Sequence, residues 1–199
     1  MKGMLKLGIV LALYATAACV GLAFVYSATS EIIAVRQQAD LEAALQELFP
    51  EGEVFTDITG AIESLNPTVA FESQYAVQKG TGFIGAVIQA SAASYGGTLT
   101  VLVGVGADGT ISRVKIMEHQ DTPGLGANAA SPTYYVNKPE KITFYGQFAG
   151  KSVQDPFEVQ GDVVAITAST ITSKAVTLAV KASGDAALAW FATQKGGAQ

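Results

Sequence analysis

Five hydroxyl side chains lie within residues 167–174. They stand between residues 162–166, whose apolar character predicts a strand, and a run of helical periodicity that extends to about Phe191. A hydroxyl cluster where a helix begins is usually an N-cap. An anion also binds well there, because free backbone N–H groups and the positive end of the helix dipole point towards it. The cluster is therefore a candidate anion or phosphate site.

A second candidate segment is 118–126, Glu-His-Gln-Asp-Thr-Pro-Gly-Leu-Gly, which directly follows a predicted strand. Pro123 and the two glycines predict a tight turn whose exposed N–H groups could meet a planar ring or a phosphate. An ordinary strand-to-loop turn has the same composition, so the residue types leave both interpretations open. His119 is the one histidine of the chain, and no second His or Cys outside the N-terminal apolar segment could join it at a metal ion.

The elements that would position these segments are antiparallel strands and a helix. Residues 69–77 and 81–89 form one predicted hairpin, and residues 98–103 and 111–117 form another. The second turn matches the G-x-G-x-x-G pattern of dinucleotide sites, but a strand follows where that site needs a helix, so we expect a plain turn at Asp108-Gly109. Helical spacing near the C-terminus brings four apolar residues onto one face: Val176, Val180, Ala187 and Phe191. The expected fold is α+β, with antiparallel strands and a C-terminal helix.

The N-terminal region predicts a membrane anchor. Residues 7–30 carry no charge, and a helix needs about 20 apolar residues to cross a bilayer. Lys2 and Lys6 precede this stretch, so the positive-inside rule places the bulk of the chain on the extracytoplasmic side of the cytoplasmic membrane. The alternative is a cleaved signal peptide, whose apolar core is usually shorter, about 7–15 residues.

Three regions are expected along the chain. The anchor covers 1–35, an acidic helical stalk and loop cover 36–66, and the folded domain covers 67–199. Within the stalk, the apolar positions fit a continuation of the anchor helix and then a short amphipathic helix that ends near Pro50.

Composition excludes several functions. The net charge is -5 and the sequence contains no cluster of Lys or Arg, so nucleic-acid binding is not expected. One Cys and one His exclude a disulfide framework, a zinc finger or an iron-sulfur site built by this chain alone.

Several motifs follow one another along nearly the whole chain. They are the N-terminal apolar segment, Tyr95-Gly96-Gly97, Asp108-Gly109, the Thr-Pro-Gly-Leu-Gly segment with its preceding His119, residues 147–151 and residues 167–176. In this order they resemble the RnfG family, the membrane-anchored flavoprotein subunits of Rnf ion-translocating oxidoreductases, and more distantly the NqrC family of sodium-pumping quinone reductases.

The resemblance implies a covalently bound cofactor. In the family, FMN is joined through its phosphate to the last threonine of a Ser/Thr-Gly-Ala-Thr motif by a separate flavin transferase. The matching acceptor here is Thr170, and Ala168 and Ser169 replace the Gly and Ala of the motif. The aspartate that often stands three residues before the motif is replaced by Val164. Candidate residues around the cofactor are Thr167, Ser169 and Thr172 near the phosphate, and Tyr95, His119, Thr122, Leu125 and Gly126 near the ring.

The function implied by the resemblance is electron relay within a membrane complex that couples ferredoxin and NAD redox chemistry to Na+ or H+ movement. The expected partners are the other Rnf subunits, especially the integral-membrane flavin subunit RnfD. The chain itself offers no persuasive acid or base for independent turnover. Two alternatives remain open: a membrane-tethered binding or assembly module without flavin, and a free-standing extracytoplasmic flavin reductase.

Overall fold

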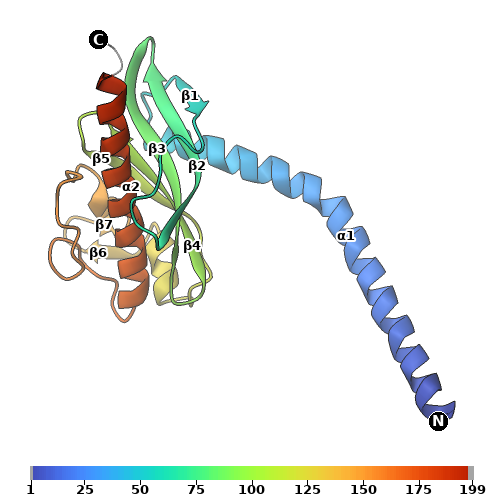
Figure 1. Ribbon diagram of the computed structural model, residues 1–199. Helices are drawn as coiled ribbons and strands as arrows, with labels where there is room; N and C mark the ends of the chain where they lie inside the picture. The colour runs from blue at the N-terminus through green and yellow to red at the C-terminus, as the bar shows by residue number, and fades with distance from the viewer. Residues whose placement is uncertain (1, 197–199) are drawn as a thin grey trace. The chain divides into compact units, whose positions relative to one another are not determined.

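The computed structural model describes residues 2–196, and these divide into two compact units with the boundary between Ala43 and Ala44. Figure 1 shows the order of elements along the chain: a long helix, a sheet, a stretch of loops with short elements, and a final helix. The fold is α+β, as the sequence predicts.

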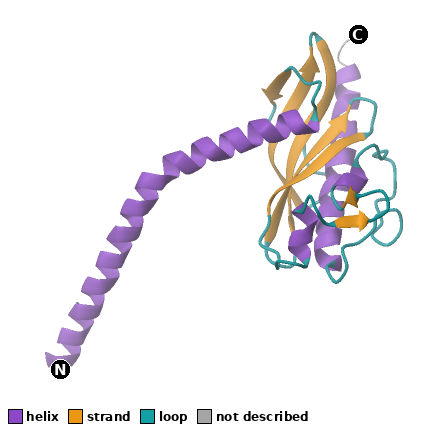
Figure 2. Cartoon of the chain, turned by 180° about the vertical axis from the view of Figure 1, so that it is seen from behind, coloured by secondary structure: helices purple, strands orange, loops and turns teal. Residues whose placement is uncertain are grey.

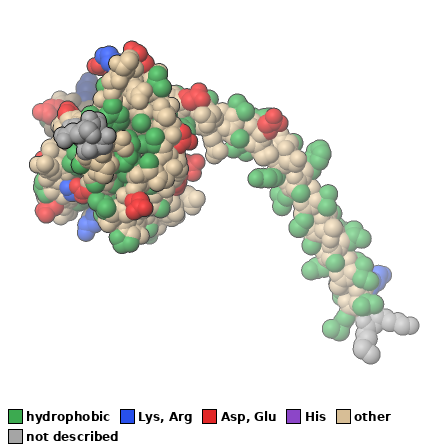
Figure 3. All heavy atoms as spheres, turned by 45° about the horizontal axis from the view of Figure 1, so that its top comes forward, with side chains coloured by type: hydrophobic (Ala, Val, Ile, Leu, Met, Phe, Trp, Pro, Cys, Tyr) green, Lys and Arg blue, Asp and Glu red, His purple; other side chains and the backbone are tan. Residues whose placement is uncertain are grey.

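The first element, α1 (Lys2–Leu48), is one uninterrupted helix. It is long and apolar enough to cross a membrane, and Figure 3 shows hydrophobic side chains along most of its length, with carboxylates towards its C-terminal end. The expectation of a separate short helix after the anchor is wrong. Residues 31–48 contain no Gly or Pro to break the helix, and both Pro50 and Gly52 come after its end.

The last turn of α1 belongs to the second unit and packs on the sheet. Leu45 and Leu48 are buried there, and the Leu48 carbonyl accepts a hydrogen bond of 2.7 Å from Ser112 Oγ. The Arg113 guanidinium donates to the carbonyl of Glu47 at 2.9 Å. These side-chain donors satisfy carbonyls that a helix end otherwise leaves without partners.

The sheet has five strands in chain order: β1 (Val54–Asp57), β2 (Val69–Lys79), β3 (Gly82–Ala93), β4 (Thr98–Gly106) and β5 (Ile111–Glu118). All neighbouring pairs are antiparallel. The four predicted strands are confirmed as β2 to β5. Strand β1 falls in the region 36–66, which is expected to be stalk and loop; it is short, mostly exposed and shows no alternation of burial.

The turn between β4 and β5 confirms the interpretation of the glycine-rich segment. Gly109 has a φ of +83°, and the amide of Thr110 donates to Asp108 Oδ1 at 3.0 Å. A strand follows this turn, so the segment lacks the helix start on which a dinucleotide pyrophosphate would rest.

The last helix, α2 (Thr170–Gly196), packs against β3 and β4 and covers one face of the sheet (Figure 2). The four apolar residues expected on one face, Val176, Val180, Ala187 and Phe191, are all buried. This packing fixes the start of α2 relative to the strand ends, and so determines which loops lie near Thr170.

Between β5 and α2 the chain is mostly irregular. It contains η1 (Gly126–Ala130), β6 (Tyr135–Asn137), β7 (Ile142–Thr143) and η2 (Gly146–Phe148). The strand predicted over 162–166 is wrong, since only an isolated bridge joins Val159 to Val163. The apolar pattern of 162–166 arises because Val163 and Ile166 anchor a loop in the core.

Candidate functional site

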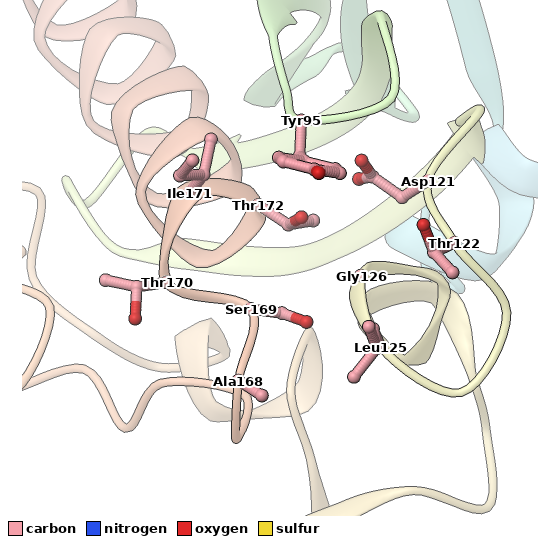
Figure 4. A pocket seen from close by; sticks show the side chains of 10 residues that line it. All are labelled: Tyr95, Asp121, Thr122, Leu125, Gly126, Ala168, Ser169, Thr170, Ile171 and Thr172. Carbon is pink, nitrogen blue, oxygen red and sulfur yellow. The ribbon is translucent and has the colours of Figure 1, made fainter.

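A hollow of about 490 Å³ lies where α2 begins, a volume within the usual range of small-molecule sites, about 300–1,000 Å³. Three segments form its wall: the loop between β3 and β4, the chain from the end of β5 into η1, and the start of α2. Its lining residues are Tyr95, Asp121, Thr122, Leu125, Gly126, Ala168, Ser169, Thr170, Ile171 and Thr172 (Figure 4).

The wall on the α2 side begins with a tight turn. The amide of Ser169 donates to the carbonyl of Ile166 at 3.0 Å, and Ala168, the third residue of this turn, has a φ of +59°. Positive φ at the third position is the feature of type II turns, which favour glycine there. The turn thus explains why a glycine suits this position, and why Ala168 occupies it at a conformational cost.

Ser173 fastens this turn to the helix. Its buried hydroxyl accepts from the amide of Ile166 at 3.0 Å and donates to the carbonyl of Ser169 at 2.9 Å. Ser173 is therefore a structural clip, and only part of the hydroxyl cluster is free to meet a ligand.

The first turn of α2 presents unpaired donors. Among the residues that the structure describes, no acceptor is found for the backbone amides of Thr170, Ile171 and Thr172, as is usual for the first residues of a helix. Thr170 is exposed, whereas Ser169 and Thr172 are buried and point towards the middle of the hollow (Figure 4). This geometry suits an anion.

The opposite wall is the turn formed by Thr-Pro-Gly-Leu. The amide of Leu125 donates to the carbonyl of Thr122 at 3.1 Å, and Gly124 has a φ of +77°. Proline in the second position and glycine in the third are the residues that a type II turn prefers. Leu125 is 43% exposed and faces the hollow from this turn (Figure 4).

Asp121 joins the three segments. Its carboxylate accepts from Ser94 Oγ at 2.6 Å and from the amide of Gly96 at 2.7 Å, and the Thr172 hydroxyl also favours its charged form. Burial raises the pKa of Asp121, but the bonds from Ser94 and Gly96, together with Thr172 and the charge interaction with His119, outweigh burial, so the pKa lies below its usual range. The carboxylate is therefore ionised at neutral pH.

Two glycines permit the close packing around Asp121. A Cβ added to Gly126 would lie 2.6 Å from Thr172 Oγ1 and 2.7 Å from Asp121 Cβ, and one added to Gly96 would overlap the carbonyl of Gln120. Any larger residue at these positions would push the segments apart. The glycines thus hold Tyr95 and the Thr-Pro-Gly-Leu turn close to the start of α2.

The structure brings together most of the residues that the sequence singled out. Thr170, Ser169, Thr172, Tyr95, Thr122, Leu125 and Gly126 all line the hollow. Two others lie outside its wall. Thr167 lines an adjacent hollow of about 430 Å³ that Thr170 also borders, and the buried Nδ1 of His119 has no hydrogen-bond partner among the described residues.

Sequence reasoning missed Asp121, Ala168 and Ile171 as lining residues. Asp121 lies within the candidate segment 118–126, but no local signal marked its role, because its partners Ser94 and Gly96 are distant in the chain. Nothing in the sequence marked Ile171, whose exposure, 55%, comes from its place on the outer side of the helix start.

Two protein-family models match this chain. Residues 94–184 match the FMN-binding domain model, which covers the three segments around the hollow. Residues 1–48 match the model of the RnfG N-terminal region, which covers α1.

Three relatives, all G subunits of ion-translocating oxidoreductase complexes, align over most of the chain. The relative from the proton-translocating ferredoxin:NAD(+) oxidoreductase complex of Clostridium ljungdahlii is 34% identical, over 80% of this chain and 78% of its own. The relative from the Na(+)-translocating complex of Acetobacterium woodii is 29% identical, over 92% of this chain and 90% of its own. The relative from the ion-translocating oxidoreductase complex of Aliivibrio fischeri strain MJ11 is 31% identical, over 89% and 87%. The chain therefore belongs to the RnfG family, the G subunits of ion-translocating ferredoxin:NAD(+) oxidoreductase complexes.

Proposed function

We propose that this protein carries FMN and passes electrons within a membrane complex that couples ferredoxin and NAD redox chemistry to ion translocation. The match to the FMN-binding domain and the names of the relatives support this function. The observation that carries it is the hollow itself, where the unpaired amides of α2 face the turn at Thr122–Leu125 across a space of ligand size. The named relatives translocate different ions, so the proposal covers H+ and Na+ alike.

The groups around the hollow fit the two ends of FMN. The amides of Thr170, Ile171 and Thr172 suit a phosphate, because they are donors at the positive end of a helix. The exposed side chains of Tyr95 and Leu125 offer apolar surface to a planar ring.

Thr170 is the proposed point of covalent attachment, by an ester of its hydroxyl with the FMN phosphate. Its side chain is exposed and no hydrogen bond to its hydroxyl is found among residues 2–196. It is the first residue of α2 and borders both hollows. A threonine hydroxyl is a weak nucleophile without an adjacent base, so the proposal assigns this step to a separate flavin transferase.

The cofactor supplies the redox chemistry, and the chain supplies position and electrostatics. Asp121 is the only side chain in the wall that is charged at neutral pH, and its lowered pKa makes it a poor proton donor there. We therefore expect no turnover of a small substrate by this chain alone.

The proposed location is the cytoplasmic membrane, with α1 as its anchor. The helix can span a bilayer, and Lys2 and Lys6 precede its uncharged stretch, so the positive-inside rule places the folded unit on the extracytoplasmic side. A tethered carrier meets its partners at a raised effective concentration. Those partners are the other Rnf subunits, among them the integral-membrane protein RnfD.

The test is in-gel flavin fluorescence of the denatured full-length protein, produced together with a flavin transferase and exported. The parent should fluoresce, Thr170→Ala should be dark, and Thr167→Ala should fluoresce as the parent does. Thr167 is a matched control because it lies three residues away, is exposed, and contributes only its backbone amide to a hydrogen bond, with the Tyr134 hydroxyl.

Dark lanes for all three proteins, with the transferase active on a known target, would refute covalent attachment. A purified protein that is also colourless would favour the alternative, a membrane-tethered binding or assembly module without flavin.

A further inference from the structure

Asp121 is a buried carboxylate inside the proposed flavin site. Asp121 is 6% exposed, and it is the only charged residue among the ten that line the hollow. Around it the wall consists of hydroxyl, aliphatic and aromatic side chains. A single charge in such surroundings has a larger electrostatic effect than the same charge on the surface, because water screens it less.

The charge of Asp121 is stabilised but not cancelled. Its donors are Ser94 and Gly96, which are neutral groups, and the Thr172 hydroxyl that also favours the charged form is neutral too. Among the side chains that the structure describes, the ion pairs are formed by lysines and go to other carboxylates. His119 acts on Asp121 by charge, but it does not line the hollow. A negative potential therefore remains in the hollow.

We propose that the Asp121 carboxylate lowers the reduction potential of the flavin by acting as a fixed negative charge beside it. This inference rests on the proposed function, and it extends that function by assigning the control of the potential to a residue of this chain. An electron that enters the ring brings negative charge towards the carboxylate, so the reduced form is disfavoured relative to the oxidised form. The sign does not depend on which edge of the ring is nearest.

Asp121 also positions the loop between β3 and β4, and its two roles can be separated. Asp121→Asn has nearly the same shape and keeps an oxygen that can accept from the amide of Gly96, but it carries no charge. Asp121→Glu keeps the charge and alters the fit. If the charge sets the potential, only the first variant should change it strongly.

The experiment is a redox titration of the flavin in purified full-length protein in detergent, followed by flavin absorbance. Asp121→Asn should shift the midpoint potential to more positive values, and Asp121→Glu should stay close to the parent. Asp108→Asn is the matched control, since it removes the same charge from a hydrogen-bonded aspartate in the β4–β5 turn, which does not line the hollow. It should leave the potential unchanged.

A second variant does not depend on the folding of Asp121→Asn. Thr122 is exposed in the same wall, and the hydrogen bonds found there use its backbone carbonyl. Thr122→Asp adds a carboxylate and should move the potential to more negative values. Thermal unfolding of each variant identifies any that is not folded.

The outcomes are distinct. A flavin-bearing parent whose potential is unaltered in Asp121→Asn, or in Thr122→Asp, would overturn the inference and leave the proposed function intact. Equal shifts in Asp121→Asn and Asp121→Glu would assign the effect to loop geometry and would also overturn it. A parent without any flavin would overturn the proposed function, and this inference with it.

Discussion

Replacing Ala168 by glycine should stabilise the folded unit, although glycine usually destabilises a protein. Ala168 has a φ of +59° in the turn before α2. For an L-residue this conformation costs about 1–2 kcal/mol. Glycine adopts it freely, but it gives the unfolded chain more conformational freedom, which costs roughly 0.4–1 kcal/mol. The expected net gain is about 0.5–1 kcal/mol.

For a unit of this size, a gain of that order should raise the melting temperature by roughly 1–4 °C. The assay is thermal unfolding of the full chain in detergent, without flavin, followed by the fluorescence of its one tryptophan. Trp190 lies on α2 against Phe83 and Phe191, so the signal reports on the folded unit and not on the apolar part of α1.

Ala165→Gly is the matched control, because Ala165 lies in the same segment and is not among the described residues with positive φ. It should lower stability by about 0.4–1 kcal/mol. Equal destabilisation by both substitutions would refute the reasoning, since it would mean that the backbone at Ala168 carries no strain that glycine relieves.

Three further changes test other parts of the structure. Gly126→Ala should lower the melting temperature and weaken flavin retention, measured on the same sample, because its Cβ would meet Thr172 and Asp121 at 2.6 and 2.7 Å. Ser173→Ala should cost about 1–3 kcal/mol in urea unfolding, since it leaves the buried amide of Ile166 without an acceptor; an unchanged midpoint would contradict its role as a clip. Burial raises the pKa of Asp162, but hydrogen bonds from Glu158 and Lys151 outweigh it, so the folded-state pKa is lowered. Its stabilisation should be complete above the unfolded-state pKa of about 3.9 and lost as the pH falls through the folded-state pKa; Asp162→Asn should be less stable at neutral pH and lose less on acidification.

The sheet and the final helix could be predicted because their signals are local. Two hairpin turns, Lys79-Gly80 and Asp108-Gly109, set the limits of β2 to β5, and helical spacing fixed the buried face of α2. The strand predicted over 162–166 failed because a short run of apolar residues shows only that some of its side chains are buried. It does not show whether a neighbouring strand is available for pairing.

The short motifs of the site could be predicted from the sequence, but the contacts between them could not. The Thr-Pro-Gly-Leu turn and the hydroxyl cluster could be read from short stretches of sequence. The role of Asp121 could not, because its partners Ser94 and Gly96 stand 27 and 25 residues earlier in the chain and come near it only when β3, β4 and β5 form a sheet. The attachment of a cofactor at Thr170 stays a prediction.

The irregular segment that leads into α2 has no strand ladder and is held by short backbone turns together with side-chain acceptors. The amide of Glu158 donates to Asp162, that of Val164 to Gln147, and that of Ile166 to Ser173. Such bonds break one at a time, whereas the amides of β3 and β4 are released only when the sheet opens. Amide hydrogen exchange should therefore be rapid in this segment while the sheet stays protected. An enzyme that modifies Thr170 would therefore act on a segment that can open locally while the rest of the domain stays folded.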